Sequence, residues 1–256
     1  MVDEGASREP SPGVAAAPEP GRELARGRAS VVYALGDGTV LRRCLDPAVD
    51  VSVEGAVMTH ARRHGVPVPV VHEASGPDLV MDHVEGPTML ADLMAHPERT
   101  RAHGRLLADL HRALDDVPPL DGVGSFDDAV PSDSAVPSDS AADGSRLLHL
   151  DLHPGNVILA PDGPVLVDWT NAGAGPRTRD VAMTWMLLAC FDLPPEVAEV
   201  AARARQQLLE GFFEHADRDA ARSALPAAAA LRLTDAATSA GERMRIAELL
   251  RSAAVD

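Results

Sequence analysis

Lysine is absent from this 256-residue chain, so arginine is its only strongly basic side chain. The absence excludes Schiff-base catalysis and a Walker A phosphate loop, because both need the lysine amine. Aromatic residues make up only 3%, so the core must be built from Leu, Val, Ala and Met. There are two cysteines, Cys44 and Cys190, and no C-x-x-C motif. We therefore expect both thiols to be reduced and buried.

Long apolar runs and a basic leader are missing as well. No run of about 18 apolar residues occurs, which excludes a typical transmembrane helix. The first twenty residues, MVDEGASREPSPGVAAAPEP, are acidic and lack the basic start and apolar centre of a signal peptide. A cytoplasmic protein is the default expectation. The net charge of −16 repels nucleic acid and anionic membranes and favours cationic partners, although a solubilising surface explains the same charge.

Composition divides the chain into four parts. Residues 1–20 are rich in Pro, Ala, Glu and Gly without periodicity, which predicts a disordered tail. Residues 21–84 are β-rich, and residues 85–256 are mostly helical. Residues 121–145 interrupt the helical part and contain the hexapeptide AVPSDS twice in a row, which indicates a flexible loop expanded by duplication.

Local patterns place the elements within these parts. Two β-branched runs in residues 30–44 flank Gly-Asp-Gly and predict a hairpin. Residues 53–65 read as a helix that ends at a glycine, and residues 66–86 as strands and turns. Leucines at every fourth position indicate helices from Thr88 onward, and almost everything after Asp180 is helical. A single β-hairpin is predicted within this helical part.

That inserted hairpin is preceded by the polar stretch LLHLDLHPGN, residues 147–156. NVILA and PVLVDW read as strands around Pro-Asp-Gly. An antiparallel pair centred near Asp162 places Asn156 opposite Asp168 at the open end, with Asp151 in the loop that enters it. Two carboxylates and an amide oxygen in one place suit Mg²⁺, which also binds waters and substrate phosphates.

Three other interpretations compete for the same residues. His149, Asp151 and His153 could form a zinc site, but neither a cysteine nor a further histidine cluster completes four ligands. A Ser-His-Asp hydrolase would need a G-x-S-x-G elbow, which the sequence lacks. A buried polar network that supports the loop suits His153 but not the whole set. Without a cation, Asp151 and Asp168 would repel each other.

The string HLDLHPGN, followed twelve residues after its asparagine by the aspartate of VLVDW, resembles the catalytic loop and metal aspartate of the protein-kinase-like superfamily. It is most similar to the H-x-D-x-H-x-x-N loop of the aminoglycoside phosphotransferase family. The resemblance covers about Arg26 to Met186. It implies a bilobal α+β fold of the protein-kinase-like type, with a small β-rich N-terminal lobe and a larger helical C-terminal lobe. By this likeness, the nucleotide lobe and connector are residues 21–84, and the catalytic and acceptor lobe is residues 85–256.

The resemblance also implies roles for individual residues. Asp151 would orient the acceptor hydroxyl and take its proton, while His149 would brace the loop. Asn156 and Asp168 would hold Mg²⁺ on the phosphates of ATP or GTP. Asp180 resembles the buried aspartate that hydrogen-bonds the catalytic-loop backbone, and a plain helix cap is the competing interpretation.

Upstream, ARGRASVVYAL resembles a glycine-rich nucleotide loop of which only Gly27 remains. The phosphate-binding lysine of the family must be replaced by an arginine of TVLRRC. Strand alternation puts Arg42 on the face of the small apolar Val40, so we choose Arg42, with Arg43 as the runner-up. Arginine keeps the charge but has a larger, planar head group.

The remaining nucleotide contacts also come from the resemblance. Glu54 resembles the helix glutamate that pairs with the phosphate-binding base, although a solvated first-turn acid is the plain alternative. Met81 would line the adenine pocket. The backbone of LVMDHVEG would present the Asp82 carbonyl and the Val84 amide to the base.

The implied activity is transfer of the γ-phosphate of ATP or GTP to the hydroxyl of a small molecule, by a monomer or a homodimer. Aminoglycosides are one acceptor class, and choline, homoserine, sugars and macrolides are others. Acidic residues after the hairpin could form a wall for a cationic acceptor, or simply solvated helix faces: Asp192, Glu196, Glu199, Glu210, Glu214, Asp217 and Asp219.

Two other activities remain as alternatives. The missing lysine and thin glycine loop would fit a pseudokinase that binds nucleotide without turnover. A protein kinase is disfavoured, because Asp168 leads into WTNAGAGPRTRD, with no D-F-G and no A-P-E segment.

Overall fold

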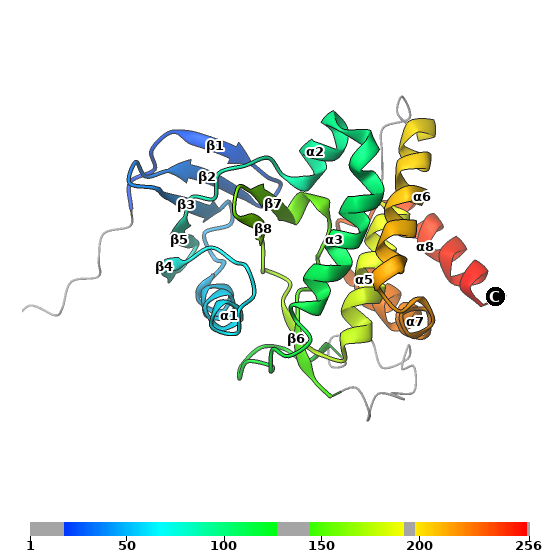
Figure 1. Ribbon diagram of the computed structural model, residues 1–256. Helices are drawn as coiled ribbons and strands as arrows, with labels where there is room; N and C mark the ends of the chain where they lie inside the picture. Colours follow the sequence, from blue (N-terminus) through cyan, green and yellow to red (C-terminus); the bar gives the residue numbers. More distant parts are fainter. Residues whose placement is uncertain (1–17, 127–143, 192–197, 255–256) are drawn as a thin grey trace, which may run out of the picture.

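A five-stranded antiparallel sheet and a group of helices form two lobes that lie side by side in Figure 1. The computed structural model describes residues 18–126, 144–191 and 198–254. Most of the tail and of the loop predicted from composition lies outside these described residues. The mixed α+β class and the division into a small β-rich lobe and a larger helical lobe are confirmed.

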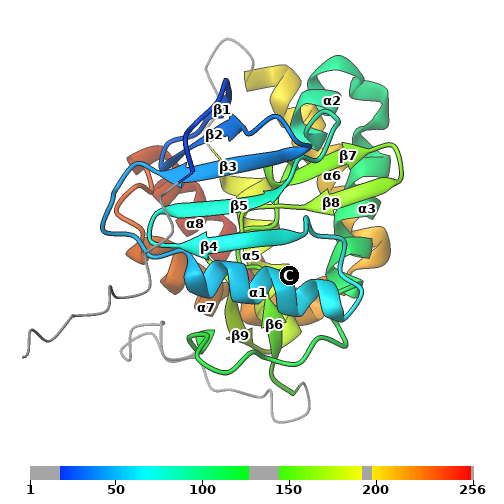
Figure 2. The ribbon, with the colours of Figure 1, turned by 90° about the vertical axis from the view of Figure 1, so that its left-hand side faces the viewer.

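The N-terminal lobe consists of the sheet and one helix. Its strands follow the order β1-β2-β3-β5-β4, with β1 (Glu23–Arg26), β2 (Ser30–Ala34), β3 (Thr39–Cys44), β4 (Val71–Ser75) and β5 (Asp78–Asp82). The predicted hairpin is the pair β2 and β3. Helix α1 (Ser52–Arg63) runs along β4, as Figure 2 shows, and the expected glycine follows it with a φ of 86°. Helix α1 contacts the other lobe through Glu54, which lies against Trp169 and Thr170.

The C-terminal lobe is built around α5. This helix is buried along nearly its whole length and packs against α6, α7 and α8. The helices of the lobe are α2 (Met89–Ala95), α3 (Thr100–Arg112), α5 (Arg177–Cys190), α6 (Ala198–His215), α7 (Arg218–Thr234) and α8 (Ala240–Ala253). Short 3-10 turns precede α3 at Pro97–Arg99 and the inserted hairpin at Pro154–Asn156. None of the helices among residues 18–126, 144–191 and 198–254 is both long and apolar enough to span a membrane.

The inserted hairpin consists of β7 (Val157–Ala160) and β8 (Gly163–Leu166). Its register differs by one residue from the sequence prediction, because Val157 pairs with Leu166. The turn holds only Pro161 and Asp162, and Gly163, with a φ of 129°, already belongs to β8. Asn156 therefore lies opposite Val167, whose amide donates to its carbonyl at 3.0 Å, and not opposite Asp168.

A second small sheet was not predicted. The strands β6 (Arg146–Leu148) and β9 (Gly173–Gly175) pair antiparallel around the predicted hairpin, which is itself present, so the sequence prediction missed this pair. Three residues of Gly-Ala-Gly carry no β-branched or alternating signal. The pair matters for the site, because it fixes both ends of the segment from the catalytic loop to α5.

One core joins the elements of both lobes. The leucines of α3 that predicted a helix contribute Leu107 and Leu110 to it, both buried. Cys190 is buried, but Cys44 is only half-buried, so the expectation of two buried thiols was correct for one of them.

Helices α3 and α6 approach each other at two glycines. A Cβ on Gly104 would lie 2.1 Å from the carbonyl oxygen of Leu208, and a Cβ on Gly211 would lie 2.0 Å from that of Arg101. Only glycine permits this backbone-to-backbone contact.

We expect Gly104→Ala to destabilise the protein by about 2 kcal/mol. Overpacking against a backbone costs up to about 3 kcal/mol, and the better helix propensity of alanine offsets up to about 1 kcal/mol. Thermal or urea unfolding measures the difference. Gly124→Ala is the matched control, because no atom lies within 4 Å of its added Cβ. Equal stability of the two variants would contradict the prediction.

Candidate active site

The loop between β6 and β7 turns sharply at Leu150. Its φ of 59° lies in the left-handed region, which leucine rarely adopts. The Asp180 carboxylate fixes the turn, because the amides of His149 and Leu150 donate to it at 3.0 and 2.8 Å. The N-cap of α5 is Pro176, so Asp180 does not cap its own helix. Burial would raise the pKa of Asp180, but the His111 ring and the backbone donors outweigh it and lower that pKa.

His149 joins this loop to the end of the hairpin. Its ring is fully buried, stacks on Trp169 with centroids 4.6 Å apart, and places Nε2 3.3 Å from the carbonyl of Val167. Nδ1 accepts the amide of Asp151 at 3.3 Å. Both ring nitrogens are therefore occupied by the protein, and the zinc interpretation fails at this residue. Across residues 18–126, 144–191 and 198–254, no group of three or more His, Cys, Asp and Glu gathers as a metal site.

Asp151 and Asn156 face each other across the loop. The side-chain amide of Asn156 donates to the Asp151 carbonyl at 2.9 Å and to its Oδ2 at 3.3 Å. This engages the amide nitrogen of Asn156 and leaves its Oδ1 for another partner. Burial raises the pKa of the Asp151 carboxyl, and His153 and His149 partly oppose the rise. A raised pKa makes the ionised carboxylate a better proton acceptor.

Asp168 follows the hairpin and is exposed. Its φ of 63° is left-handed, and the Thr170 hydroxyl donates to its Oδ1 at 2.8 Å. Asn156 is joined through its carbonyl to Val167, the residue before Asp168. The structure thus brings Asp151, Asn156 and Asp168 to one end of the hairpin despite the one-residue change of register.

Arg42 and Glu54 form a buried ion pair between β3 and α1. Glu54 also accepts the Trp169 amide at 3.3 Å. Its Oε2 lies 3.2 Å from the Thr170 hydroxyl, which shares its one proton between this carboxylate and Asp168. Burial raises the pKa of Glu54, and the Arg42 guanidinium counteracts that rise. The pair therefore lies directly behind the segment that carries the exposed aspartate.

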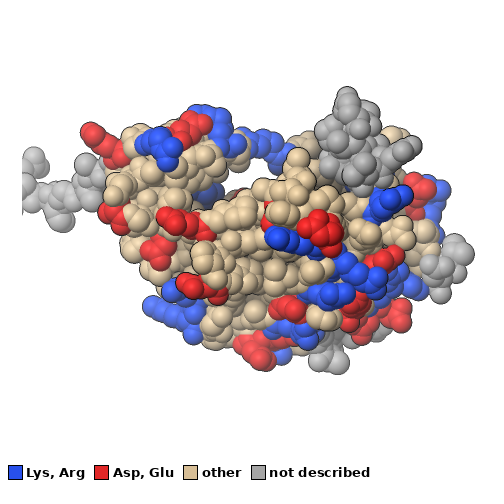
Figure 3. All heavy atoms as spheres, turned by 45° about the horizontal axis from the view of Figure 1, so that its top comes forward, with Lys and Arg blue, Asp and Glu red and all other residues tan. Residues whose placement is uncertain are grey.

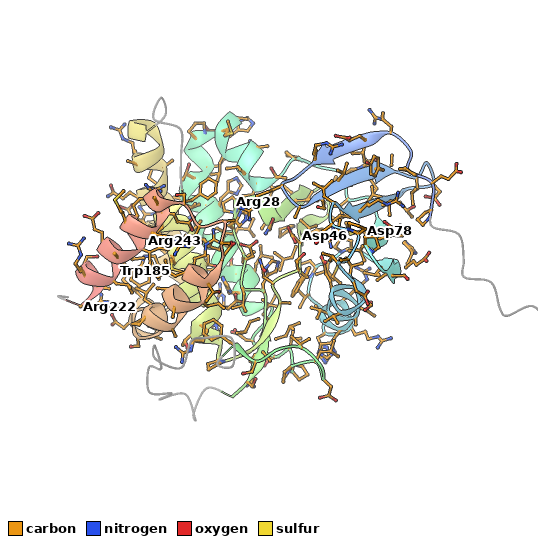
Figure 4. The ribbon with its side chains drawn as sticks, turned by 180° about the vertical axis from the view of Figure 1, so that it is seen from behind. Arg28, Asp46, Asp78, Trp185, Arg222 and Arg243 are labelled. Atoms are coloured by element: carbon orange, nitrogen blue, oxygen red, sulfur yellow. The ribbon has the colours of Figure 1, made fainter. Side chains whose placement is uncertain are left out.

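The runner-up arginine, Arg43, points to the other face of β3. Its Nε and Nη2 donate to the Asp78 carboxylate at 2.6 and 2.7 Å. This pair anchors β3 to β5, and Figure 4 shows Asp78 in the N-terminal lobe. Strand alternation thus separates the two arginines as expected.

Gly27 lies in the tight turn between β1 and β2, where its amide donates to the Ser30 carbonyl at 2.9 Å. Figure 4 places the next residue, Arg28, where this turn faces the C-terminal lobe. Across the described residues, the Arg28 side chain makes no hydrogen bond or ion pair. At this turn Arg28 therefore offers a guanidinium without a described protein partner on the side that faces the C-terminal lobe.

The connector leaves the sheet at the end of β5. Met81 is buried opposite Val40, and Asp82 lies opposite Thr39, with its carboxylate 2.7 Å from the His72 ring. The chain then separates from the sheet, and Val84 is half-buried in an extended stretch. These residues line the junction of the two lobes, where Figure 3 shows the surface hollowed.

A cavity of about 260 Å³ opens beside Asp151 on the C-terminal lobe. The end of α7 forms its far wall. There the Arg232 guanidinium donates to Glu242 at 2.8 and 3.3 Å and to Asp235 at 3.1 Å. The lining residues are Gly124, Ser125, Phe126, Leu150, Asp151, Asn171, Ala172, Gly173, Met183, Leu231, Arg232, Thr234 and Asp235.

None of the described acids among those that could have formed an acidic wall lines this cavity. Glu214 binds Arg101 and Arg105 of α3, and hydrogen bonds from these two arginines lower its pKa to about 2. Glu210 also lies 3.5 Å from Arg101, and Asp217 caps α7. Asp219 is exposed beside Arg222, and the side chains of Asp192, Glu196 and Glu199 lie outside the description. The described acids pair with arginines, cap a helix or are exposed to solvent. On the face of this lobe that Figure 3 shows, positive and negative side chains are interspersed.

Several side chains of this site have only weak signals in the sequence. Thr170 lies two residues after Asp168, and this proximity to a candidate metal ligand is its one signal in the sequence. Arg232 and Asp235 belong to no motif, and only the fold brings α7 to the catalytic loop. His111 and Thr184, which lie beneath the loop, read simply as helix residues.

Comparison with known proteins agrees with this geometry. The sequence profile described as "Phosphotransferase enzyme family" matches residues 20–133 and 132–222. The chain belongs to this phosphotransferase family. The resemblance drawn from HLDLHPGN is thereby confirmed. A search of curated protein sequences with this chain finds no match.

Solved structures with the same fold include several small-molecule kinases. The aminoglycoside phosphotransferase APH(4)-Ia has a TM-score of 0.58 at 16% identity, covering 90% of this chain and 93% of its own. The choline kinase LicA from Streptococcus pneumoniae has a TM-score of 0.55 at 10% identity, covering 91% and 92%. Amicoumacin kinase hAmiN, solved with AMP-PNP, Ca²⁺ and Ami, has a TM-score of 0.50 at 16% identity, covering 93% and 88%. At these identities the likeness establishes the fold, which is that of the protein-kinase-like phosphotransferases.

Proposed function

We propose that this phosphotransferase moves the γ-phosphate of ATP or GTP to a hydroxyl of a small molecule. The observation that carries the proposal is the meeting of Asp151, Asn156 and Asp168 at the end of the β7–β8 hairpin. The buried Arg42–Glu54 pair directly behind them supports it. Phosphoryl transfer asks a protein mainly for positioning and charge neutralisation, and this site offers both.

The donor set fits a magnesium nucleotide. Asn156 would supply Oδ1 and Asp168 its exposed carboxylate, and two protein oxygens suffice for Mg²⁺ shared with phosphates and water. In the described residues, Nε of Arg42 has no hydrogen-bond partner, so Glu54 engages only part of the guanidinium. When bound, Mg²⁺ would neutralise charge on the phosphates. Gly27 and Arg42 would hold those phosphates from the small lobe, and Met81, Asp82 and Val84 would receive the base.

Within this proposal, Asp151 acts on the acceptor. Its carboxylate borders the cavity, where it can orient a hydroxyl and accept its proton as the oxygen attacks. The raised pKa of Asp151 favours that proton transfer. Asn156 keeps the carboxylate in place, and His149 and Asp180 fix the loop that carries it.

The cavity suits an acceptor with at least one positive group. The guanidinium of Arg232 is shared by two carboxylates, Glu242 and Asp235, and Asp151 faces the same space. The described lining holds two acids, Asp151 and Asp235, against the one base Arg232, and this excess of negative charge favours amino alcohols over anionic alcohols. Aminoglycosides and choline-like compounds both belong to this class.

A pseudokinase is the second candidate. It is favoured by the arginine at the phosphate-binding position and by the single remaining glycine of the nucleotide loop, because arginine differs from lysine in size and shape. A module of this kind would bind Mg-ATP without turning it over.

A phosphorylation screen decides between the two. The protein is incubated with Mg-ATP or Mg-GTP and a panel of aminoglycosides, choline, amino sugars, homoserine and macrolides, and phosphorylated products are detected by mass spectrometry. Nucleotide binding is measured in parallel by calorimetry. Product formation on an amino alcohol supports the enzyme, and binding without any product supports the pseudokinase. The absence of nucleotide binding would overturn both proposals.

A further inference from the structure

His111 of α3 is buried beneath the catalytic loop and has no part in the chemistry proposed above. Its ring faces two side chains of α5. Nε2 lies 2.9 Å from the Thr184 hydroxyl, and Nδ1 lies 3.6 Å from the Asp180 carboxylate. Positions four apart lie above one another on a helix face, so one imidazole spans both side chains.

The direction of these hydrogen bonds follows from proton counting. The Thr184 hydroxyl has a single proton and donates it to the Leu152 carbonyl at 2.8 Å, since a carbonyl can only accept. Thr184 must therefore accept from His111, so Nε2 of His111 carries a proton.

Both α5 side chains hold the backbone around Asp151. Asp180 accepts the amides of His149 and Leu150, the two residues before Asp151. Thr184 donates to the carbonyl of Leu152, the residue after Asp151. The left-handed conformation of Leu150 persists only where the surroundings over-determine it. Together the two side chains clamp the loop on either side of Asp151, and His111 contacts both of them.

We propose that His111 and Thr184 are positioning residues that set the orientation of the Asp151 carboxylate through the backbone of the catalytic loop. The inference rests on the proposed role of Asp151. The two residues act on the geometry of transfer and not on nucleotide binding, because they lie below the loop on the side of α3 and α5. Loss of the clamp should therefore change kcat and leave the KM for ATP nearly constant.

The test compares variants that differ in one hydrogen-bonding group. Thr184→Val removes the hydroxyl and keeps the shape, whereas Thr184→Ser keeps the hydroxyl. His111→Leu removes the donor, whereas His111→Gln keeps an N–H of similar reach. Misplacement of a catalytic group by about 1 Å costs roughly 10²-fold in rate, so we expect Thr184→Val and His111→Leu to lose about 10–10²-fold in kcat. Thr184→Ser and His111→Gln should recover most of it, and the KM for ATP should change less than about twofold in all four.

Thr100→Val controls for the loss of a buried threonine hydroxyl. Thr100 is buried on α3 and donates to the Pro97 carbonyl at 2.6 Å, away from the catalytic loop. The Thr100→Val variant should lose about as much thermal stability as Thr184→Val and keep the wild-type kcat. An unchanged kcat in folded Thr184→Val, or an equal loss in Thr184→Val and Thr184→Ser, would overturn the inference.

The ring protons of His111 give a test that does not need turnover. In ¹⁵N NMR of the full-length protein, His111 should show a protonated Nε2, and this signal should change in Thr184→Val while that variant stays folded. An unprotonated Nε2 would overturn the inference even if Thr184→Val unfolds. If wild-type protein shows no phosphotransfer, the proposed function fails and this spectrum still decides whether the clamp exists.

Discussion

Replacement of Asp151 by asparagine is expected to lower kcat for phosphoryl transfer by about 10²–10⁴-fold, the usual contribution of a general base. The substitution preserves the shape of the side chain and the bond from Asn156 to the backbone carbonyl of residue 151. Among the described residues that line the acceptor cavity, Asp151 and Asp235 are the two with carboxylates. The substitution removes the one on the loop and leaves Asp235 on the far wall. Steady-state kinetics with an acceptor found in the screen measures the loss.

Asp162→Asn is the matched control, because Asp162 is an exposed residue in the β7–β8 turn. It makes the same chemical change 11 residues along the chain and should keep the wild-type kcat. The pH profile adds an independent check. Asp151 must be ionised to accept a proton and burial raises its pKa, so kcat/KM should fall as the pH drops through a value above the ordinary range of aspartate. Wild-type turnover by Asp151→Asn would exclude Asp151 as the base.

Replacement of Arg42 by methionine should have the largest effect on stability. It leaves Glu54 buried with only a backbone amide and a hydroxyl as donors. Removing one partner of a buried ion pair typically costs about 3–5 kcal/mol. We expect a loss of this size near neutral pH, measured by urea unfolding, together with weaker binding of Mg-ATP.

The Arg42→Met/Glu54→Gln double variant separates stability from binding. Without a buried charge it should recover most of the lost stability, yet it should still bind Mg-ATP weakly because the cation is missing. Recovery of nucleotide affinity in the double variant would contradict the role of Arg42 at the phosphates. Arg43→Met, which breaks the partly exposed pair with Asp78, serves as control and should leave nucleotide affinity unchanged.

The stability loss of Arg42→Met should also depend on pH. The folded-state pKa of Glu54 is raised by burial, and without Arg42 nothing of opposite charge counteracts it. A buried carboxyl costs little while it is protonated, so the stability loss of Arg42→Met should be small at acidic pH. It should grow as the pH rises through that pKa. A deficit that is independent of pH between mildly acidic and alkaline conditions would argue against an unpaired Glu54.

The sequence predicted the parts of this protein that depend on local patterns. The β2–β3 hairpin, α1 and the β7–β8 hairpin each follow from turn residues and side-chain periodicity, and the predicted placement of Asp151 and Asp168 at the open end of the hairpin agrees with the structure. Strand alternation also separated Arg42 from Arg43, because successive side chains point to opposite faces of a strand.

The misses have a physical origin in long-range contacts. The β6–β9 pair forms because residues on either side of the hairpin are brought together, and its Gly-Ala-Gly strand has no intrinsic preference for β structure. The one-residue error of register came from the turn length, which depends on the conformation of Gly163. Arg232 and His111 lie on helices whose neighbours are set only by packing of the whole lobe.

The contacts of Glu54 have a consequence for any movement of the two lobes relative to each other. This carboxylate is carried by α1 of the small lobe, yet it binds the amide of Trp169 and the hydroxyl of Thr170 on the strand exit of the large lobe. Any motion that separates the lobes must break these bonds and leave the buried Glu54 carboxylate with Arg42 as its remaining partner. The Leu166 amide, which donates to the Pro67 carbonyl at 2.7 Å, is a further bond between the lobes, so their separation would have to break buried contacts both on α1 and on the loop that follows it.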